Sequence, residues 1–142
     1  MTPAGYSGTP LPKKLGIREG ARVALLGAPA ELDPLLDPLP ADVALVRGLR
    51  GTRPFDVVLA FCRTERELER GLAAGRERLT EDGGLWLCWP KKSSGLATEL
   101  ADGVVRERGL ASGLVDNKVC AVDETWSGLR FVVRRADRRK KA

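Results

Sequence analysis

Short apolar runs, separated by polar segments rich in glycine and proline, divide the sequence into alternating strands and helices. The runs that predict strands contain few polar residues, as expected for strands covered on both faces of a parallel sheet. They are Arg22–Leu26, Val43–Val46, Phe55–Phe61, Leu85–Trp89, Lys118–Val122 and Leu129–Val133. Only residues 123–128 separate the last two runs, too few for a crossover helix, so these two strands are expected to pair antiparallel.

Apolar residues at helical spacing predict three helices between the strands. A short helix is expected within Glu31–Leu39, where Pro38 stops it early. A longer one begins at Thr64, because Thr64–Glu67 matches a capping box, and the pair Gly83-Gly84 is expected to end it. A third is expected after the loop at residues 90–95. The inward positions are Leu68, Leu72 and Leu79 in the second helix, and Leu96, Leu100 and Val104 in the third, which ends at Gly109.

This order of elements favours a three-layer, Rossmann-like α/β fold. We expect a mainly parallel sheet of about six strands with an antiparallel C-terminal strand. The 142 residues suit a single domain at 21–135. Residues 1–20 are expected to form an extended leader arm, and residues 136–142 a disordered basic tail.

The basic character of the chain is confined to its end. The net charge is +5, but six of the 24 Lys and Arg residues and only one of the 19 acids lie between Arg134 and Lys141. The remaining 18 basic and 18 acidic residues balance, so no basic domain face is predicted. The tail is interpreted as a solvated terminus, with binding to RNA, DNA or another acidic partner as the alternative.

Composition excludes several classes of chemistry. Histidine is absent, which removes histidine-based catalytic units and metal sites. Cys62, Cys88 and Cys120 lie in apolar runs without a C-x-x-C pair and are interpreted as buried free thiols. No apolar run approaches the ~20 residues of a membrane span. With no apolar signal-like segment at the start, a cytoplasmic protein without membrane contact is expected.

Part of the sequence resembles the later half of a Rossmann-type methyltransferase. The resemblance rests on Phe55–Leu59, the capped helix and the segment Asp82–Leu87. It implies S-adenosylmethionine as cofactor, with Gly27 and Asp56 near it. In such enzymes a glycine-rich turn follows the first strand and an acid at the end of the second holds the ribose. At these two places this chain has Gly27-Ala28-Pro29-Ala30 and Arg47.

A second resemblance covers nearly the whole chain. The segments Tyr6–Gly16, Trp89–Lys92 and Asp123–Arg130 resemble a short bacterial family known only as a domain of unknown function and frequent in actinobacteria. This family implies no activity, substrate or catalytic residue.

The carboxyl ends of the parallel strands are the expected ligand edge. The loop after the fourth strand supplies two cations and two hydroxyls, and the helix expected behind it supplies amides for a phosphate or carboxylate. The alternative is that a serine caps that helix while the lysines are solvated. The candidate anion-binding residues are Lys91, Lys92, Ser93 and Ser94, with Gly27 and, from the leader, Lys13 and Lys14.

The loop between the last two strands is a second candidate. Asp123 and Glu124 would act as acid and base there, and Arg130 would clamp an anion. The favoured alternative is a hairpin in which Trp126 covers the end of the sheet while Arg130 pairs with an acid.

The sequence therefore predicts a non-catalytic, Rossmann-like binding or regulatory module without a cofactor, for an anionic small molecule or a protein partner. A minimal methyltransferase that uses S-adenosylmethionine and an RNA- or ribosome-associated protein that uses the tail are the alternatives.

Overall fold

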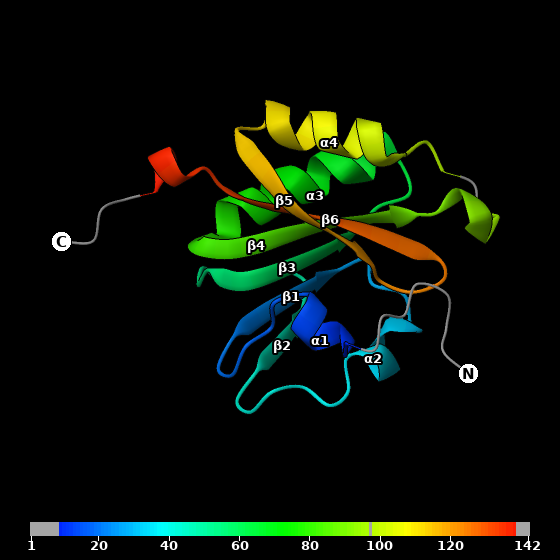
Figure 1. Cartoon of the computed structure of the whole chain (residues 1–142). Helices are drawn as coiled ribbons and strands as arrows, with labels where there is room; N and C mark the ends of the chain where they lie inside the picture. Colours follow the sequence, from blue (N-terminus) through cyan, green and yellow to red (C-terminus); the bar gives the residue numbers. More distant parts are fainter. Residues whose placement is uncertain (1–8, 97, 139–142) are drawn as a thin grey trace.

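A six-stranded sheet with the order β2-β1-β3-β4-β6-β5 runs through the molecule (Figure 1). The computed structural model describes residues 9–96 and 98–138. Strands β1 to β4 are parallel, and β6 is antiparallel to both of its neighbours, β4 and β5. The strands are β1 Arg22–Leu26, β2 Ala44–Arg47, β3 Phe55–Phe61, β4 Leu79–Pro90, β5 Leu114–Ala121 and β6 Trp126–Val133. The expected Rossmann-like sheet, with its antiparallel C-terminal strand, is confirmed.

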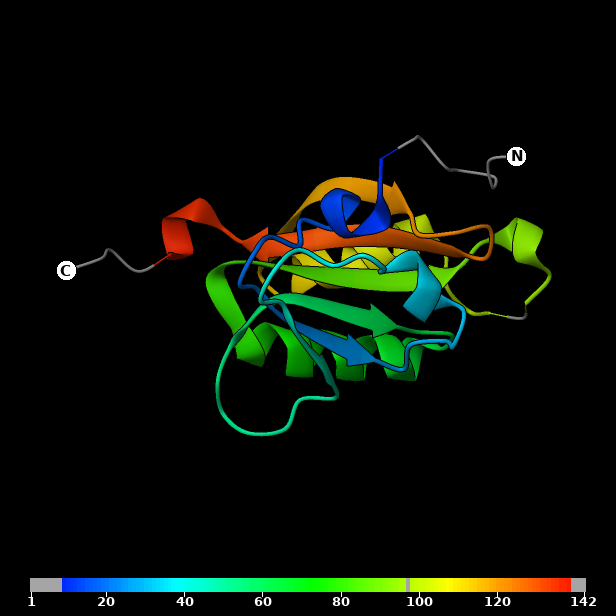
Figure 2. The same ribbon diagram turned by 90° about the horizontal axis from the view of Figure 1, so that it is seen from below.

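Helices cover both faces of this sheet and complete the three layers (Figures 1 and 2). One face packs against α3 and α4, and the other against the short helices α1 and α2. The helices are α1 Leu11–Lys14, α2 Leu32–Leu35, α3 Glu65–Arg78 and α4 Asp102–Ala111, with single 3₁₀ turns η1 Lys92–Ser94 and η2 Arg135–Asp137. The antiparallel strand β6 lies inside the sheet, between β4 and β5, so β5 forms the edge.

The leader is part of the hydrophobic core. We expected an extended arm, but the leader forms the helical turn α1, and Leu15 is only 1% exposed. The buried indole Nε1 of Trp86 donates a hydrogen bond of 3.0 Å to the Leu15 carbonyl oxygen. This bond holds the leader against the face of the sheet that α1 and α2 cover.

The best-marked helix of the sequence begins as predicted. Thr64 caps α3, because its hydroxyl accepts a hydrogen bond of 3.0 Å from the Glu67 amide. The Glu67 carboxylate accepts one of 2.7 Å from the Arg63 amide. Arg78, at the other end of α3, donates to the carbonyl oxygens of Leu49 and Arg53 at 2.5 and 2.6 Å. These bonds hold the loop that joins β2 to β3.

Two element boundaries differ from the sequence prediction. Strand β4 begins at Leu79 rather than Leu85 and includes the glycine pair that we expected to end the helix. Helix α4 begins only at Asp102, and Leu96 is 44% exposed instead of facing the core. Gly109 does not end α4 but lies within it, where the ring of Phe131 leaves no room for a Cβ atom.

At the C-terminal end, the exposed turn η2 occupies Arg135–Asp137 and overlaps the first residues of the segment expected to be disordered. Residues 139–142 lie outside the described part of the chain, as does the start of the leader at 1–8.

Candidate functional site

The carboxyl ends of β1 and β2 hold a glycine turn and an ion pair. Gly27 follows β1 with a φ of +64°, and a Cβ atom there would lie 3.1 Å from the Phe61 carbonyl oxygen. At the end of β2, Arg47 Nη2 lies 2.6 Å from Asp33 Oδ1. Both side chains of this pair are more than half exposed. The edge therefore presents a paired cation where a methyltransferase would present a carboxylate.

Next to this pair, the end of β3 is covered by the chain itself. The rings of Phe61 and Trp126 meet edge to face, with centroids 5.1 Å apart. The guanidinium of Arg63 lies 5.0 Å from the centre of the Trp126 ring. Asp123 closes the turn before β6, because its Oδ1 accepts hydrogen bonds from the amides of Thr125 and Trp126 at 2.8 and 2.7 Å. In this arrangement Asp123 and Trp126 shape the hairpin.

The turn after β4 is stabilised by its own hydroxyl group. Ser94 Oγ donates to the Lys91 carbonyl oxygen at 2.6 Å and accepts from the Leu96 amide at 3.2 Å. Lys92 and Ser93 are exposed. The expected helix amides are not at this turn, because α4 begins at Asp102 and no side chain caps it. The predicted combination of lysines, serines and a helix start is therefore wrong in its helical part.

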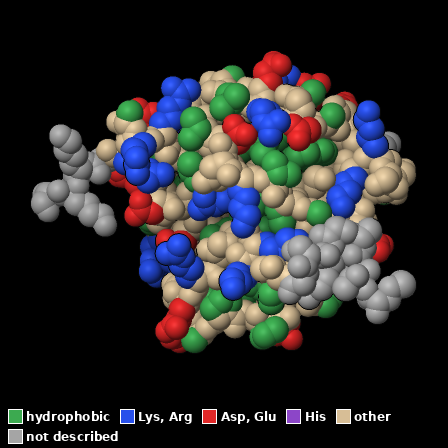
Figure 3. Space-filling view, viewed as in Figure 1, with side chains coloured by type: hydrophobic (Ala, Val, Ile, Leu, Met, Phe, Trp, Pro, Cys, Tyr) green, Lys and Arg blue, Asp and Glu red, His purple; other side chains and the backbone are tan. Residues whose placement is uncertain are grey.

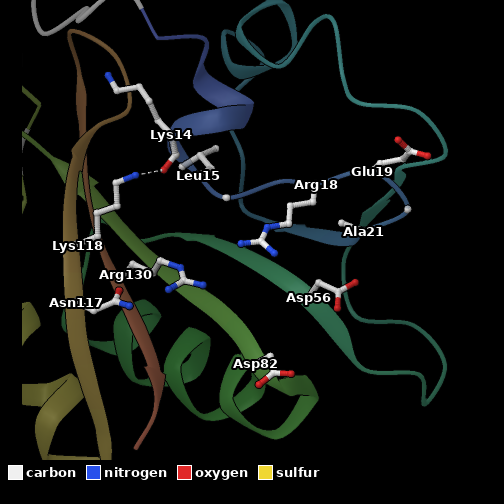
Figure 4. A pocket seen from close by; sticks show the side chains of 12 residues that line it. Lys14, Leu15, Arg18, Glu19, Ala21, Asp56, Asp82, Asn117, Lys118 and Arg130 are labelled. Atoms are coloured by element: carbon white, nitrogen blue, oxygen red, sulfur yellow. Dashed lines mark hydrogen bonds between the residues drawn. The ribbon is translucent and has the colours of Figure 1, made fainter. Parts of the chain in front are cut away.

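A cleft of about 780 Å³ opens at the opposite edge, where the parallel strands begin (Figure 4). The segment from Lys14 to Ala21 forms one wall, and Asn117 and Lys118 of β5 lie on the other side. Asp56, Asp82 and Arg130 complete the lining. Figure 4 shows the guanidinium groups of Arg18 and Arg130 pointing toward each other across this cleft, while Glu19 points away.

Arg130 is placed in the cleft by the register of three strands. It lies opposite Trp86 of β4 and opposite Lys118 of β5. The pairing shifts at Asn117, which forms a bulge beside the cleft. The guanidinium lies over Gly84, where a Cβ atom would come within 2.7 Å of Arg130 Cζ. Burial, together with the charges of Arg138 and Arg18, lowers the pKa of Arg130.

Two cations of the cleft lack a partner within the described chain, and a third is hydrogen-bonded. Neither Arg18 nor Arg130 forms a hydrogen bond or an ion pair through its guanidinium with any part of the chain that the structure describes. Lys118 Nζ donates to the Lys14 carbonyl oxygen at 2.9 Å. The expected pairing of Arg130 with an acid is therefore wrong.

Acidic side chains occupy the other end of the cleft. Asp56 Oδ2 accepts a hydrogen bond of 2.8 Å from the Arg22 amide. Asp82 Oδ1 lies 3.9 Å from Arg138 Nη1, and its side chain is largely exposed. The position of Asp56 contradicts its expected place near a cofactor, because Asp56 lies at the start of β3 whereas Gly27 follows the end of β1.

The two leader lysines line different hollows of the surface. Lys14 lines the cleft at the amino ends of the strands. Lys13 borders a shallower groove, whose other residues include Pro10, Pro38 and Pro40. Sequence reasoning named Lys14 with the turn after β4 and Arg130 with the hairpin loop, whereas both line this cleft, and it did not name Arg18, Asp82 or Asn117.

The described residues offer neither a metal-binding cluster nor a membrane-spanning helix. Across residues 9–96 and 98–138, no group of three or more Cys, Asp or Glu side chains is arranged to hold a metal ion. None of the helices in these ranges has the length and apolar character to traverse a bilayer. All three cysteines are free and buried, as predicted. Burial raises the pKa of the Cys62 thiol to about 12.

Solved structures with a similar fold are methyltransferases. A methyltransferase from Pyrococcus furiosus aligns with a TM-score of 0.58 and 18% identity, over 92% of this chain and 86% of that one. The N-methyltransferase NodS from Bradyrhizobium japonicum aligns at 0.56 and 13%, over 85% and 90% of the two chains. A TehB-like SAM-dependent methyltransferase from Corynebacterium glutamicum aligns at 0.51 and 14%, over 82% of each. At these identities the likeness shows the fold alone.

No curated protein matches the sequence significantly. A family model described as a protein of unknown function (DUF3052) matches residues 50–135, more than half of the chain. The matched region runs from the loop before β3 to the end of β6 and thus includes Asp56, Asp82 and Arg130 of the cleft. The chain belongs to this family, and it has the fold of the Rossmann-like methyltransferases.

Proposed function

We propose that this protein is a non-catalytic member of the methyltransferase fold that works as a small binding or regulatory module. The observation that carries the proposal is the ion pair between Arg47 and Asp33 at the end of β2. In the methyltransferases this position carries the acid that accepts hydrogen bonds from the ribose hydroxyls, whereas here it carries Arg47, which only donates and which occupies the nearby Asp33 carboxylate.

The turn after β1 supports the same proposal. Backbone amides that approach a ligand are the usual contribution of this turn, and Pro29 has no amide hydrogen to offer. At the end of the neighbouring strand β3, Trp126 contacts the ring of Phe61 edge to face and the guanidinium of Arg63. The residues at this edge therefore do not fit S-adenosylmethionine, and no methyl-transfer step is assigned to this chain.

Binding of the demethylated product, S-adenosylhomocysteine, tests the proposal. We expect no heat of binding in calorimetry and no change in melting temperature. Bound ligand at a hundred times its Kd would stabilise the fold by about 2.7 kcal/mol, which is readily measured. Saturable binding would overturn the proposal.

If S-adenosylhomocysteine binds, the Asp33→Asn variant tests whether the Asp33 carboxylate holds its ribose. Asp33 supplies a carboxylate beside the end of β2, and its exposed pair with Arg47 contributes little to stability. Loss of S-adenosylhomocysteine binding in a folded Asp33→Asn variant would restore the methyltransferase alternative, with Asp33 as the acid that holds the ribose.

A further inference from the structure

The cleft at the amino ends of the strands contains positive charge that the protein leaves uncompensated. Arg18 and Arg130 face each other across it, and Lys118 lies opposite Arg130 in the sheet (Figure 4). Like charges placed directly opposite on neighbouring strands destabilise a sheet. A folded protein would be expected to separate neighbouring like charges or to pair them with acids. Here the guanidinium groups of Arg18 and Arg130 face each other, and neither is paired with an acid of the described chain.

The acids that line the same cleft, Glu19, Asp56 and Asp82, form no ion pair with Arg18 or Arg130. Asp56 is engaged by the Arg22 amide, and Asp82 faces Arg138 at 3.9 Å. The cleft is therefore polarised, with guanidinium groups at one end and carboxylates at the other. Figure 3 shows a band of Lys and Arg side chains across the middle of the face seen in Figure 1. An anion approaching this face meets a favourable potential.

The surroundings of Arg130 hold its guanidinium in place. Gly84 and Trp86 are successive residues on one face of β4. The guanidinium of Arg130 lies over Gly84, and the backbone of Arg130 pairs with Trp86. The indole of Trp86 is fixed by its bond to the Leu15 carbonyl and passes close to Gly128. Gly84 thus makes room for the side chain of Arg130, and Gly128 makes room for that of Trp86. The conformation of the Arg130 side chain is therefore restricted by its neighbours.

We propose that this cleft binds the phosphate monoester of a small hydroxylated molecule, such as a sugar phosphate or a nucleoside monophosphate. The phosphate lies between Arg18 and Arg130, with Lys118 adding charge at its side. Two guanidinium groups suit a dianion with several acceptor oxygens, because each can donate two parallel hydrogen bonds. The hydroxyl groups of the ligand lie toward Asp56 and Asp82, which accept their hydrogen bonds.

The size of the cleft favours such a molecule over a simple ion. Its volume of about 780 Å³ falls within the range of small-molecule sites, far above what inorganic phosphate fills. The proposal goes beyond the proposed function and does not depend on it. The S-adenosylhomocysteine test concerns the opposite edge of the sheet, so either idea can fail alone.

Calorimetry on the full chain at constant ionic strength tests the ligand class. Four probes are compared: ribose 5-phosphate, inorganic phosphate, ribose and succinate. We expect ribose 5-phosphate to bind most tightly, inorganic phosphate more weakly, and ribose and succinate weakest of all. Succinate binding as tight as that of ribose 5-phosphate would overturn the phosphate assignment, and so would the absence of binding by both phosphate probes.

Arg130→Gln tests the site. The Arg130 guanidinium has no partner within the described chain, so this substitution breaks no hydrogen bond and the variant should fold. We expect ribose 5-phosphate to bind at least about tenfold more weakly, with a melting temperature equal to or above that of the parent. Arg66→Gln removes the same charge from the exposed face of α3 and serves as the matched control, with unchanged affinity.

Gly84→Ala tests the same position without removing a charge. The added methyl group occupies the seat of the guanidinium and displaces it, so affinity should fall although Arg130 remains. A double variant of Lys91 and Lys92 to Ala examines the opposite edge. Unchanged affinity in Arg130→Gln and Gly84→Ala, or a loss only in the double lysine variant, would overturn the assignment of the site.

Discussion

Gly109→Ala adds one methyl group to α4 at a place already filled by the ring of Phe131. A Cβ atom at this position would lie 2.7 Å from Phe131 Cδ2 and still closer to two other carbons of the ring. The ring is completely buried, and its strand is paired on both sides, with Leu85 of β4 and Asp116 of β5. The ring therefore has little freedom to move away from the added methyl group.

Two opposing effects decide the sign of this change. Alanine in place of glycine within a helix favours folding by about 1 kcal/mol. Overpacking of a well-filled core usually costs about 1–3 kcal/mol, and contact with three ring atoms places this site at the upper end. We expect the free energy of unfolding to fall by about 2 kcal/mol, since the packing cost exceeds the gain in helix propensity.

Gly103→Ala is the matched control, because it makes the same substitution in the same helix. A Cβ atom at position 103 would meet no atom within 4 Å. Only the helix propensity term remains, so this variant should be more stable than the parent by up to about 1 kcal/mol. The two alanine variants should therefore differ by about 3 kcal/mol, with opposite signs.

Urea unfolding, followed by circular dichroism, measures both values. The dependence of stability on urea concentration should be the same in all three proteins, so the midpoints report stability directly. If Gly109→Ala is stabilised as much as Gly103→Ala, the packing of α4 on β6 described here is wrong. A second change, Phe131→Leu, should recover part of the loss in Gly109→Ala by removing the clashing ring atoms.

The remaining predictions concern single side chains. Arg78→Lys should lower the free energy of unfolding by about 1–3 kcal/mol in thermal or urea denaturation, because one ammonium cannot replace the forked bonds to the loop carbonyls. Arg47→Ala should change it by no more than about 1 kcal/mol, since its pair with Asp33 is exposed. Cys62 should resist alkylation at pH 8 in the folded protein, because burial raises its pKa from 9.0 to about 12. In the unfolded chain this thiol ionises at a lower pH than in the folded protein. The contribution of the neutral thiol to the free energy of unfolding is therefore complete below pH 9 and is lost as pH rises from 9 toward 12. The Cys62→Ala variant should lose less stability over this pH range.

The regular elements could be predicted from sequence because they follow from local patterns. Strand β3 was predicted with its observed bounds, since an apolar run after Pro54 has few other interpretations. Thr64 and Glu67 marked the start of α3 through a hydrogen-bonding pattern confined to four residues. In both cases the signal lies within the element itself.

The glycine pair at 83 and 84 shows where local reasoning fails. In sequence it is typical of a helix end, yet both residues lie within β4. Their lack of a side chain is explained by distant groups, the Asp56 carbonyl next to Gly83 and the Arg130 guanidinium over Gly84. No pattern near these glycines could show this, because the register of β4 with β6 is a property of the folded sheet.

The direction of β6 explains why the candidate cleft lies at the edge where the parallel strands begin. An antiparallel strand returns the later part of the chain to that edge, so Arg130 reaches the amino ends of β3 and β4. There its guanidinium faces that of Arg18, which lies in the segment of the leader that follows α1. The cleft thus joins segments from both ends of the chain and exists only when the whole sheet has formed. A ligand bound between Arg18 and Arg130 would consequently tie the leader to the last strand and stabilise the fold as a unit.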